Sequence, residues 1–373
     1  MDIRLLDVEP NSRWRRRTTG LVAVALMFTA CAPVSKLPEI DQASAEQEAQ
    51  KQREITIEEQ EKAKRLVHRL SLRIQTANAE LCEKTAYTSG ARIVVGGSSK
   101  KPFARARRKV YGLGHLAKIV QVPQGSAAWS GGLRDGDEIL ALGGENSPEK
   151  AGKVKGWINE RLEALAAEGT PIPFTVKRED TTVSVEVTPV PICDYPFHVV
   201  EDDAVNATAD SETVEVHTGL IRFVENDDEL ALILGHELAH NTMEHIQRSE
   251  GNYVAGALVG AVFGAILGVD LSGVGGRIGA GAFSQEFEAE ADYVGVYYAA
   301  RAGFDVSGVA KLWRRMAARN PTSIHLTGTT HPSSAKRFIA IEKTAEEVAA
   351  KRAKGEPLVP ETKDGDGAEE KAN

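Results

Sequence analysis

Apolar residues recur at helical spacing in two stretches of the chain, which predicts two amphipathic helices. The first stretch is 56–81, where Leu66, Leu70 and Ile74 lie on one helical face after a charged linker. The second stretch is 306–319. A helix with an apolar stripe buries it against a core, so we expect the first helix to pack on the domain downstream.

Short apolar strands and turns alternate between residues 90 and 190, in contrast to the helical spacing on either side. This pattern predicts a small β-rich domain. The expected elements are a short helix at 127–131, a strand at 138–142, a long helix at 155–167 and closing strands at 173–176 and 182–187.

Residues 226–240 predict a more deeply buried helix, because most positions after its first turn are apolar. Asn226 is the expected N-cap, and Glu229 would complete a capping box. Glycine in the dipeptide Gly235-His236 suits a place where another backbone comes close to the helix. We therefore expect this helix in the interior of the protein.

The same helix carries the pattern His236-Glu237-x-x-His240. Positions i and i+4 share one helical face, so both imidazoles can bind one metal ion. Glu237 is the candidate general base for activating a water molecule, as in zinc peptidases. The alternative is a buried helix whose histidines only form hydrogen bonds. His245 is about half a turn out of phase with His236, and we expect it to be solvated or to support a ligand.

A second motif follows at 283–293, where Glu288 and Asp292 share one face of a predicted helix. Glu288 would complete a His₂Glu ligand set that leaves one position for water. Asp292 would accept a hydrogen bond from a ligand imidazole and fix its tautomer. The alternative is a solvated acidic helix face, since Glu286 and Glu290 are also present.

Together these motifs resemble those of the gluzincin peptidases related to HtpX, BepA and the CAAX prenyl proteases. The resemblance covers residues 196–343 and implies an α+β fold, with a mainly helical peptidase domain and a small edge sheet. Other matching residues are Asn206-Ala207, Thr218-Gly219-Leu220, and Thr330-His331-Pro332 with Arg337 after it.

The resemblance also implies how the site is built. One Zn²⁺ per chain is expected on His236, His240 and Glu288. Arg337, like Asp292, is expected behind these ligands, where it would orient them.

Further residues have implied roles in the reaction. His331 is expected near the zinc, where it would either stabilise the oxyanion or occupy the open position. The strand expected at 213–220, including Thr218, Gly219 and Leu220, would align substrate backbone by strand addition. The implied substrates are misfolded or misassembled proteins of the bacterial envelope.

The β-rich segment contains a run, 125–140, that resembles the core of bacterial PDZ domains. This implies a PDZ domain at 90–190 that binds peptide C-termini. The alternative is a PDZ-like spacer with a closed groove. The loop that would capture a terminal carboxylate through backbone N–H groups is expected at Leu113, Gly114, His115 and Leu116.

The first 31 residues resemble a bacterial lipoprotein signal. Arg13, Arg15, Arg16 and Arg17 precede an apolar run at 21–30, which is too short to span a bilayer. Residues 1–30 are expected to be removed and Cys31 to be lipidated, with the body facing the periplasm and the outer membrane favoured. The alternative is an uncleaved N-terminal anchor.

Cys82 and Cys193 are the only other thiols, because the chain has three cysteines. A disulfide between them would join the start of the β-rich segment to its end. The sequence does not give their separation in space, so the geometric condition for pairing is left open.

Charge and composition narrow the remaining possibilities. The 373 residues carry a net charge of −8 and no basic block outside the extreme N-terminus, so nucleic acid is not an expected partner.

Residues 344–373 are charged and poor in large apolar residues, which predicts a disordered tail. Residues 254–269 are uncharged, with glycine at every fourth position, and predict a helix packed on the active-site core or lying at a membrane surface.

The sequence therefore predicts a lipid-anchored, PDZ-containing zinc endopeptidase of the bacterial envelope, in which 31–89 form a linker and an N-terminal helix. Two alternatives remain. One is a chaperone or adaptor with a latched or vestigial zinc site. The other is an integral membrane protease that uses 254–269 as a span.

Overall fold

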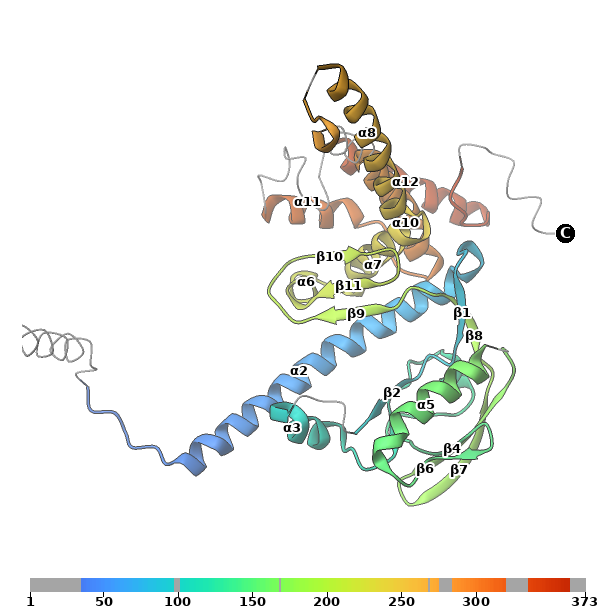
Figure 1. The fold of residues 1–373 in the computed structure, drawn as a ribbon. Coiled ribbons are helices and arrows are strands. Elements are labelled where there is room, and N and C mark those ends of the chain that lie inside the picture. Colours follow the sequence, from blue (N-terminus) through green and yellow to red (C-terminus); the bar gives the residue numbers. More distant parts are fainter. Residues whose placement is uncertain are drawn as a thin grey trace, which may run out of the picture. The chain divides into compact units, whose positions relative to one another are not determined.

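The computed structural model describes residues 35–96, 101–167, 169–267, 269–274, 284–319 and 335–362 (Figure 1). Contacts divide the chain into two units, 1–51 and 52–373. The predicted lipoprotein signal with Cys31 lies outside the described residues.

Helix α2 (Gln42–Ala77) begins in the first unit, well before the predicted start at residue 56. The Asp41 carboxylate caps it by accepting hydrogen bonds from the backbone N–H and the hydroxyl of Ser44. The supposed linker is helical because Gln, Glu, Ala and Lys, which dominate it, all favour helix.

In the second unit, residues 92–187 build an antiparallel sheet with strand order β2-β3-β4-β6-β7, and β5 pairs with β4. Its core is apolar, with Ile119, Leu133 and Ile139 fully buried. The helices and strands predicted here are confirmed, except that α5 begins before residue 155. Helix α3 and strands β2, β3 and β5 were not predicted. The elements are β2 (Arg92–Val95), α3 (Lys101–Tyr111), β3 (Ala117–Gln121), α4 (Ala127–Ser130), β4 (Glu138–Leu142), β5 (Glu145–Asn146), α5 (Ala151–Ala166), β6 (Ile172–Arg178) and β7 (Thr181–Val187).

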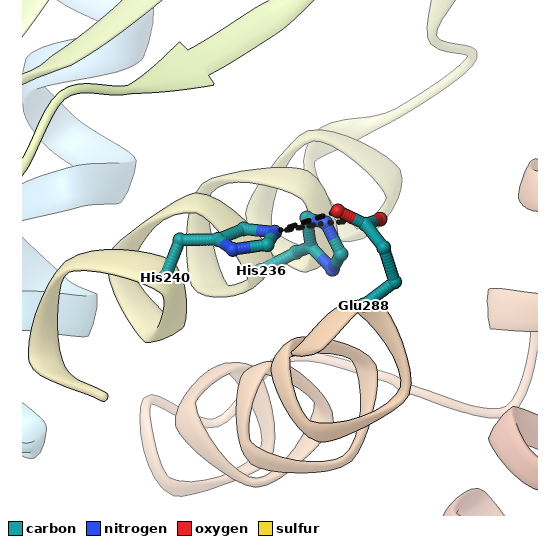
Figure 2. Close-up of side chains that lie close together, drawn as sticks. All are labelled: His236, His240 and Glu288. Carbon is teal, nitrogen blue, oxygen red and sulfur yellow. Dashed lines mark hydrogen bonds and ion pairs between the residues drawn. The ribbon is translucent and has the colours of Figure 1, made fainter. Parts of the chain in front are cut away.

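Helices α7 (Asp227–Thr242) and α10 (Ser284–Arg301) form the centre of the helical segment. Their backbones come unusually close. A Cβ atom added to Gly235 would lie 2.6 Å from the carbonyl oxygen of Gly295, and one added to Gly295 would lie 2.7 Å from the Cα of His236. The close approach predicted at Gly235 is therefore confirmed, and side chains of the two helices face each other (Figure 2).

Helix α2 packs on this helical core, as predicted. Leu70 and Ile74 are fully buried and belong to the same apolar cluster as Leu230 and Tyr297. The 3₁₀ turn η1 (Ala79–Leu81) follows α2 and leads into the β-rich segment.

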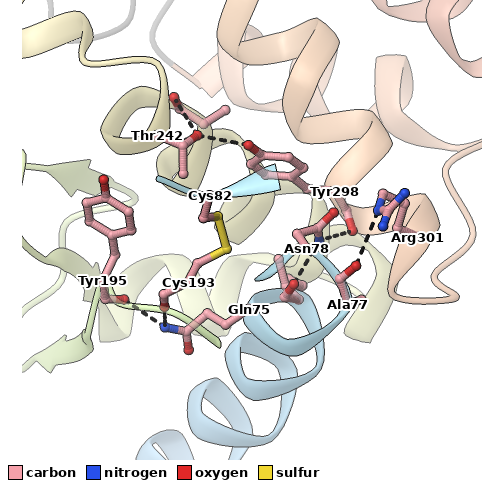
Figure 3. The surroundings of a disulfide bond; sticks show 11 residues. Gln75, Ala77, Asn78, Cys82, Cys193, Tyr195, Thr242, Tyr298 and Arg301 are labelled. Atoms are coloured by element: carbon pink, nitrogen blue, oxygen red, sulfur yellow. Dashed lines mark hydrogen bonds between the residues drawn. A yellow bond between two sulfur atoms is a disulfide. The ribbon is translucent and has the colours of Figure 1, made fainter. Parts of the chain in front are cut away.

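The start and end of the β-rich segment meet beside the end of α2 (Figure 3). Strands β1 (Thr85–Thr88) and β8 (Val190–Cys193) pair antiparallel. Cys82 and Cys193 form a disulfide, with Cα atoms 5.5 Å apart. The Gln75 side chain donates hydrogen bonds to the carbonyls of Cys193 and Tyr195, at 2.8 and 3.0 Å. The structure thus contains the pairing that the sequence left open.

A three-stranded sheet precedes α7, and it corrects two predictions. The strand expected at 213–220 ends at His217, and Thr218 begins a short helix, α6 (Thr218–Phe223), whose first turn donates hydrogen bonds to the Asp202 carbonyl. That strand also lies in the middle of the sheet, paired on both sides, so it has no free edge for a substrate strand. The strands are β9 (Phe197–Val200), β10 (Ala207–Ala209) and β11 (Val214–His217).

Helix α8 (His245–Leu267) contains the uncharged glycine-rich run. Val254, Leu258, Val259 and Val262 of this run are 57–65% exposed, so these side chains do not pack on the active-site core. The glycines at every fourth position mark another face of the helix, and both positions predicted for the run, against the core or at a membrane surface, stay predictions. In the described part of the chain, no helix combines the length and apolarity needed to cross a membrane.

Helices α11 (Val309–Arg319) and α12 (Ala335–Lys354) complete the helical segment. The disordered tail was predicted to begin at residue 344, and this boundary is wrong. Helix α12 continues to Lys354 and buries Thr344 and Val348. A narrow stripe of buried side chains, which includes Ile341 and Val348 of the apolar core, holds this helix. Residues 363–373 of the predicted tail lie outside the described residues.

The contact between α7 and α10 generates a stability prediction. Gly235→Ala should lower the free energy of unfolding by about 1–3 kcal/mol, because the new methyl group overpacks the interface. Gly156→Ala on α5 is the control, since its added Cβ would meet only Glu160 Oε1 at 3.9 Å. Alanine there should be neutral or stabilising by up to about 1 kcal/mol. Denaturant unfolding followed by circular dichroism measures both, and wild-type stability of Gly235→Ala would contradict the close contact.

Candidate metal centre

Helix α7 presents His236 and His240 from one face into the interior, where they are 1% and 8% exposed. The helix starts as predicted, since the Asn226 side chain accepts a hydrogen bond from the Glu229 N–H at 3.0 Å. The Glu229 carboxylate does not return to the cap residue. It accepts from the N–H of Glu225 instead, at 2.8 Å.

Helix α10 brings the buried Glu288 opposite the two imidazoles (Figure 2). The Nε2 atoms of His236 and His240 are 3.1 Å apart. Glu288 Oε1 is 3.3 Å from His240 Nε2, and Glu288 Oε2 is 3.7 Å from His236 Nε2. These donor atoms are close enough to share one metal ion.

The residues present fit a zinc ion. Ligand bonds of about 2.0–2.2 Å in a tetrahedral site place donor atoms roughly 3.3–3.6 Å apart, close to the observed separations. Two imidazoles and one carboxylate are also a donor set of catalytic zinc sites, which keep one position for water.

A carboxylate and a guanidinium lie behind His236. Asp292 Oδ1 is 3.0 Å from His236 Nδ1, the nitrogen that faces away from Glu288. Arg337 of α12 donates two hydrogen bonds to Asp292, at 2.7 and 2.9 Å, and a third to Glu288 at 2.9 Å. Arg337 therefore joins the carboxylate that faces the metal position to the carboxylate that orients a ligand.

The protonation states of this group follow from burial and neighbouring charge. Burial lowers the pKa of His236, which favours the neutral imidazole that metal binding requires. Burial alone would raise the pKa of Asp292, but hydrogen bonds from His236 and Arg337 outweigh it and lower that pKa. The ionised Asp292 then accepts the Nδ1–H of His236 and leaves Nε2 free to bind a metal.

His240 has a different partner, His245. Their Nδ1 atoms are 3.0 Å apart, and His245 Nε2 is 3.0 Å from Glu290 Oε2. His245 is 3% exposed, and burial lowers its pKa. Of the two expectations for His245, solvation is therefore wrong, and the structure places it against a candidate ligand.

A break between α7 and α8 explains the position of His245. Glu244 adopts a left-handed backbone conformation with φ of 56°, and α8 begins at the next residue. A continuous helix would have turned His245 away from His240. Sequence reasoning missed the His245–Glu290 pair because glutamate is not a usual signal for a left-handed residue.

Two further residues complete the surroundings. Glu237, between the two histidines, is 2% exposed. Trp313 of α11 contacts the His236 ring edge-on, with ring centroids 5.1 Å apart, and also lies near the Arg337 guanidinium. The sequence pattern predicted only that Trp313 belongs to an amphipathic helix at 306–319, so its contact with the site was not predicted.

Other predicted site residues lie elsewhere. The loop 113–116 connects α3 to β3, and the Leu113 N–H donates to the Arg108 carbonyl at 2.9 Å. At least one N–H of the expected carboxylate loop is therefore used to end a helix. His331 lies outside the described residues, so its position near the metal stays a prediction.

Comparison with known proteins agrees with this geometry. The profile of Peptidase family M48 matches residues 181–345. The mitochondrial metalloendopeptidase OMA1 of Schizosaccharomyces pombe is 34% identical over 166 residues, which are 42% of this chain and 49% of that protein. An HtrA-type protease solved with a decapeptide covers 33% of this chain, but its TM-score of 0.20 and 17% identity support no inference.

Bacterial relatives match a shorter region. The beta-barrel assembly-enhancing protease of Yersinia pestis is 31% identical over 33% of this chain and 28% of its own length. That of Escherichia coli (strain K12) is 32% identical over 30% of this chain and 26% of its own length. The chain thus spans about half or less of these relatives. The family profile and these relatives together support assigning residues 181–345 to peptidase family M48.

Proposed function

We propose that this chain is a zinc-dependent endopeptidase of the bacterial cell envelope. The observation that carries the proposal is the buried donor set of His236, His240 and Glu288 on two packed helices, with Glu237 between the histidines. The M48 family assignment supports a metallopeptidase.

The proposed mechanism uses the residues around this donor set. A zinc ion held there would lower the pKa of a water molecule and polarise the scissile carbonyl. Glu237 takes the proton of the attacking water and passes it to the leaving amine nitrogen. Asp292 keeps a proton on Nδ1 of His236. His331, by resemblance, either donates a hydrogen bond to the developing oxyanion or blocks the open position at rest.

We place the substrate backbone along β10, which ends the sheet order, rather than along β11. The Asn241 side chain supports this placement. It accepts a hydrogen bond from the Ser211 N–H at 2.8 Å and donates one to the Thr213 carbonyl at 2.9 Å. It therefore fastens the β10–β11 turn to α7, one residue after His240, and a strand added to β10 would run beside the metal helix.

Specificity and location are proposed from the sequence resemblances and from the names of the relatives. Residues 90–190 act as a PDZ domain that binds peptide C-termini. A peptide with a free C-terminal carboxylate should therefore bind, and the same peptide with an amidated C-terminus should not.

Cys31 carries a lipid anchor that holds the body in the periplasm, at the outer membrane. Loss of lipid labelling in Cys31→Ser tests this anchor. The substrates are misfolded or misassembled envelope proteins.

The competing function is a chaperone or adaptor with a latched or vestigial site. A vestigial site has no need of buried, mutually hydrogen-bonded groups such as Asp292 and Arg337, which are costly to keep when they support nothing. The endopeptidase is therefore the better-supported proposal.

The donor set generates a metal prediction. Purified wild-type protein should contain one Zn²⁺ per chain, and Glu288→Gln should lose most of it, because the amide is a far weaker ligand than a carboxylate. Glu286→Gln, exposed on the same helix, is the matched control and should keep the metal. Elemental analysis after dialysis measures all three, and full zinc content in Glu288→Gln would assign the metal to other ligands.

The general base generates an activity prediction. Glu237→Gln should keep zinc but lose roughly 10²–10⁴-fold in kcat, the usual contribution of positioned acid–base catalysis. Cleavage of an unfolded protein such as casein, with zinc content measured on the same samples, provides the readout. Turnover close to wild type would remove Glu237 from this role, and retained substrate binding without cleavage in wild type would favour the chaperone.

A further inference from the structure

We infer that His245 and Glu290 are positioning residues for His240. Glu290 holds the ring of His245, and His245 holds the ring of His240 in the orientation and tautomer that metal binding needs. This inference rests on the proposed zinc site and gives a role to His245, which lies outside both helical motifs, and to Glu290, which the second motif left unassigned.

The contacts form a continuous series from the metal position to the protein surface. His240 Nε2 is 3.1 Å from His236 Nε2 and 3.3 Å from Glu288 Oε1, so this nitrogen faces the donor set. The other nitrogen of His240, Nδ1, is 3.0 Å from His245 Nδ1. His245 Nε2 is 3.0 Å from Glu290 Oε2.

These contacts permit one direction of hydrogen bonding. When His240 offers the lone pair of Nε2 to a metal, its proton lies on Nδ1 and is donated to His245. His245 Nδ1 is then an acceptor, so the His245 proton lies on Nε2. An ionised carboxylate only accepts, and Glu290 is therefore the partner that this second proton needs. The carboxylate fixes the tautomers of both rings.

Packing also prevents the His245 ring from rotating. The ring stacks on Phe287 of α10, with centroids 4.8 Å apart and an interplanar angle of 17°. It meets the His240 ring edge-on, with centroids 5.0 Å apart. A ligand is held in productive geometry only when its support is itself fixed, and here residues from α7, α8 and α10 meet around one imidazole.

The two candidate ligand histidines are thus supported in different ways. His236 donates directly to Asp292, whose side chain is 2% exposed and bound by Arg337. The series of contacts from His240 through His245 to Glu290 is called the relay here. It passes through a second imidazole and ends at Glu290, whose side chain is 39% exposed. Water competes for the exposed carboxylate, so the last link of the relay should contribute less than the middle one.

Zinc affinity, measured by competition with a chromophoric chelator, tests this relay. His245→Phe keeps a ring to stack on Phe287 but removes both ring nitrogens, and should weaken zinc binding about 10–100-fold. His245→Gln returns an acceptor for His240 and should recover part of that loss. Glu290→Gln should lose less than His245→Phe, and the exposed control Glu286→Gln should bind as wild type does.

The absorption spectrum of Co²⁺-substituted protein gives a second readout, because it reports ligand geometry. It should change in His245→Phe and stay unchanged in Glu286→Gln. Circular dichroism and thermal unfolding of the metal-free proteins separate positioning from folding.

Wild-type zinc affinity in His245→Phe would overturn the relay. Equal losses in His245→Phe and His245→Gln would overturn it as well, because they would indicate packing alone. If the wild type binds zinc and both His245 variants bind it with the same affinity, only the relay is refuted. A wild type that binds no zinc refutes the proposed function and the relay together.

Discussion

The contact between the backbones of α7 and α10 is the constraint on which the candidate site depends. Gly235 and Gly295 leave out the side chains that would hold the helices apart, and His236 follows directly in the same turn. Because protein interiors are close-packed, one methyl group at this point would move whole helices rather than a single side chain. The histidines of one helix and Glu288 of the other share a metal position only at this spacing.

Buried charge is the next constraint. Glu288 and Asp292 are two carboxylates in the interior, and Arg337 supplies one opposing charge to both. An unbalanced buried negative charge is costly. A divalent cation bound by Glu288 and two neutral imidazoles would offset this negative charge. The buried charge that destabilises the metal-free cluster therefore favours zinc binding. Folding and metal binding are coupled at such a site.

The sequence predicted those features that are encoded within one helix or one short turn. The i, i+4 spacing placed His236 and His240, the Asn226 cap fixed the start of α7, and Gly235 indicated a neighbouring backbone. It could not predict the position of His245, which depends on a left-handed Glu244 between two helices. Nor could it show that β11 is a central strand, because pairing on both edges is decided by segments distant in sequence. Helix α12 was missed because composition alone does not reveal a narrow buried stripe.

The disulfide has a consequence for how the chain could be rearranged. The Cα atoms of Cys82 and Cys193 are 5.5 Å apart, a gap that a single intervening residue can bridge, since consecutive Cα atoms are about 3.8 Å apart. The chain leaves the helical body at one point and returns to it at the same point. In topological terms, the β-rich segment is an insertion. It could be exchanged for a domain with another binding specificity, or deleted, while α2 and β9 stayed connected and the helices that carry the candidate ligands kept their own core.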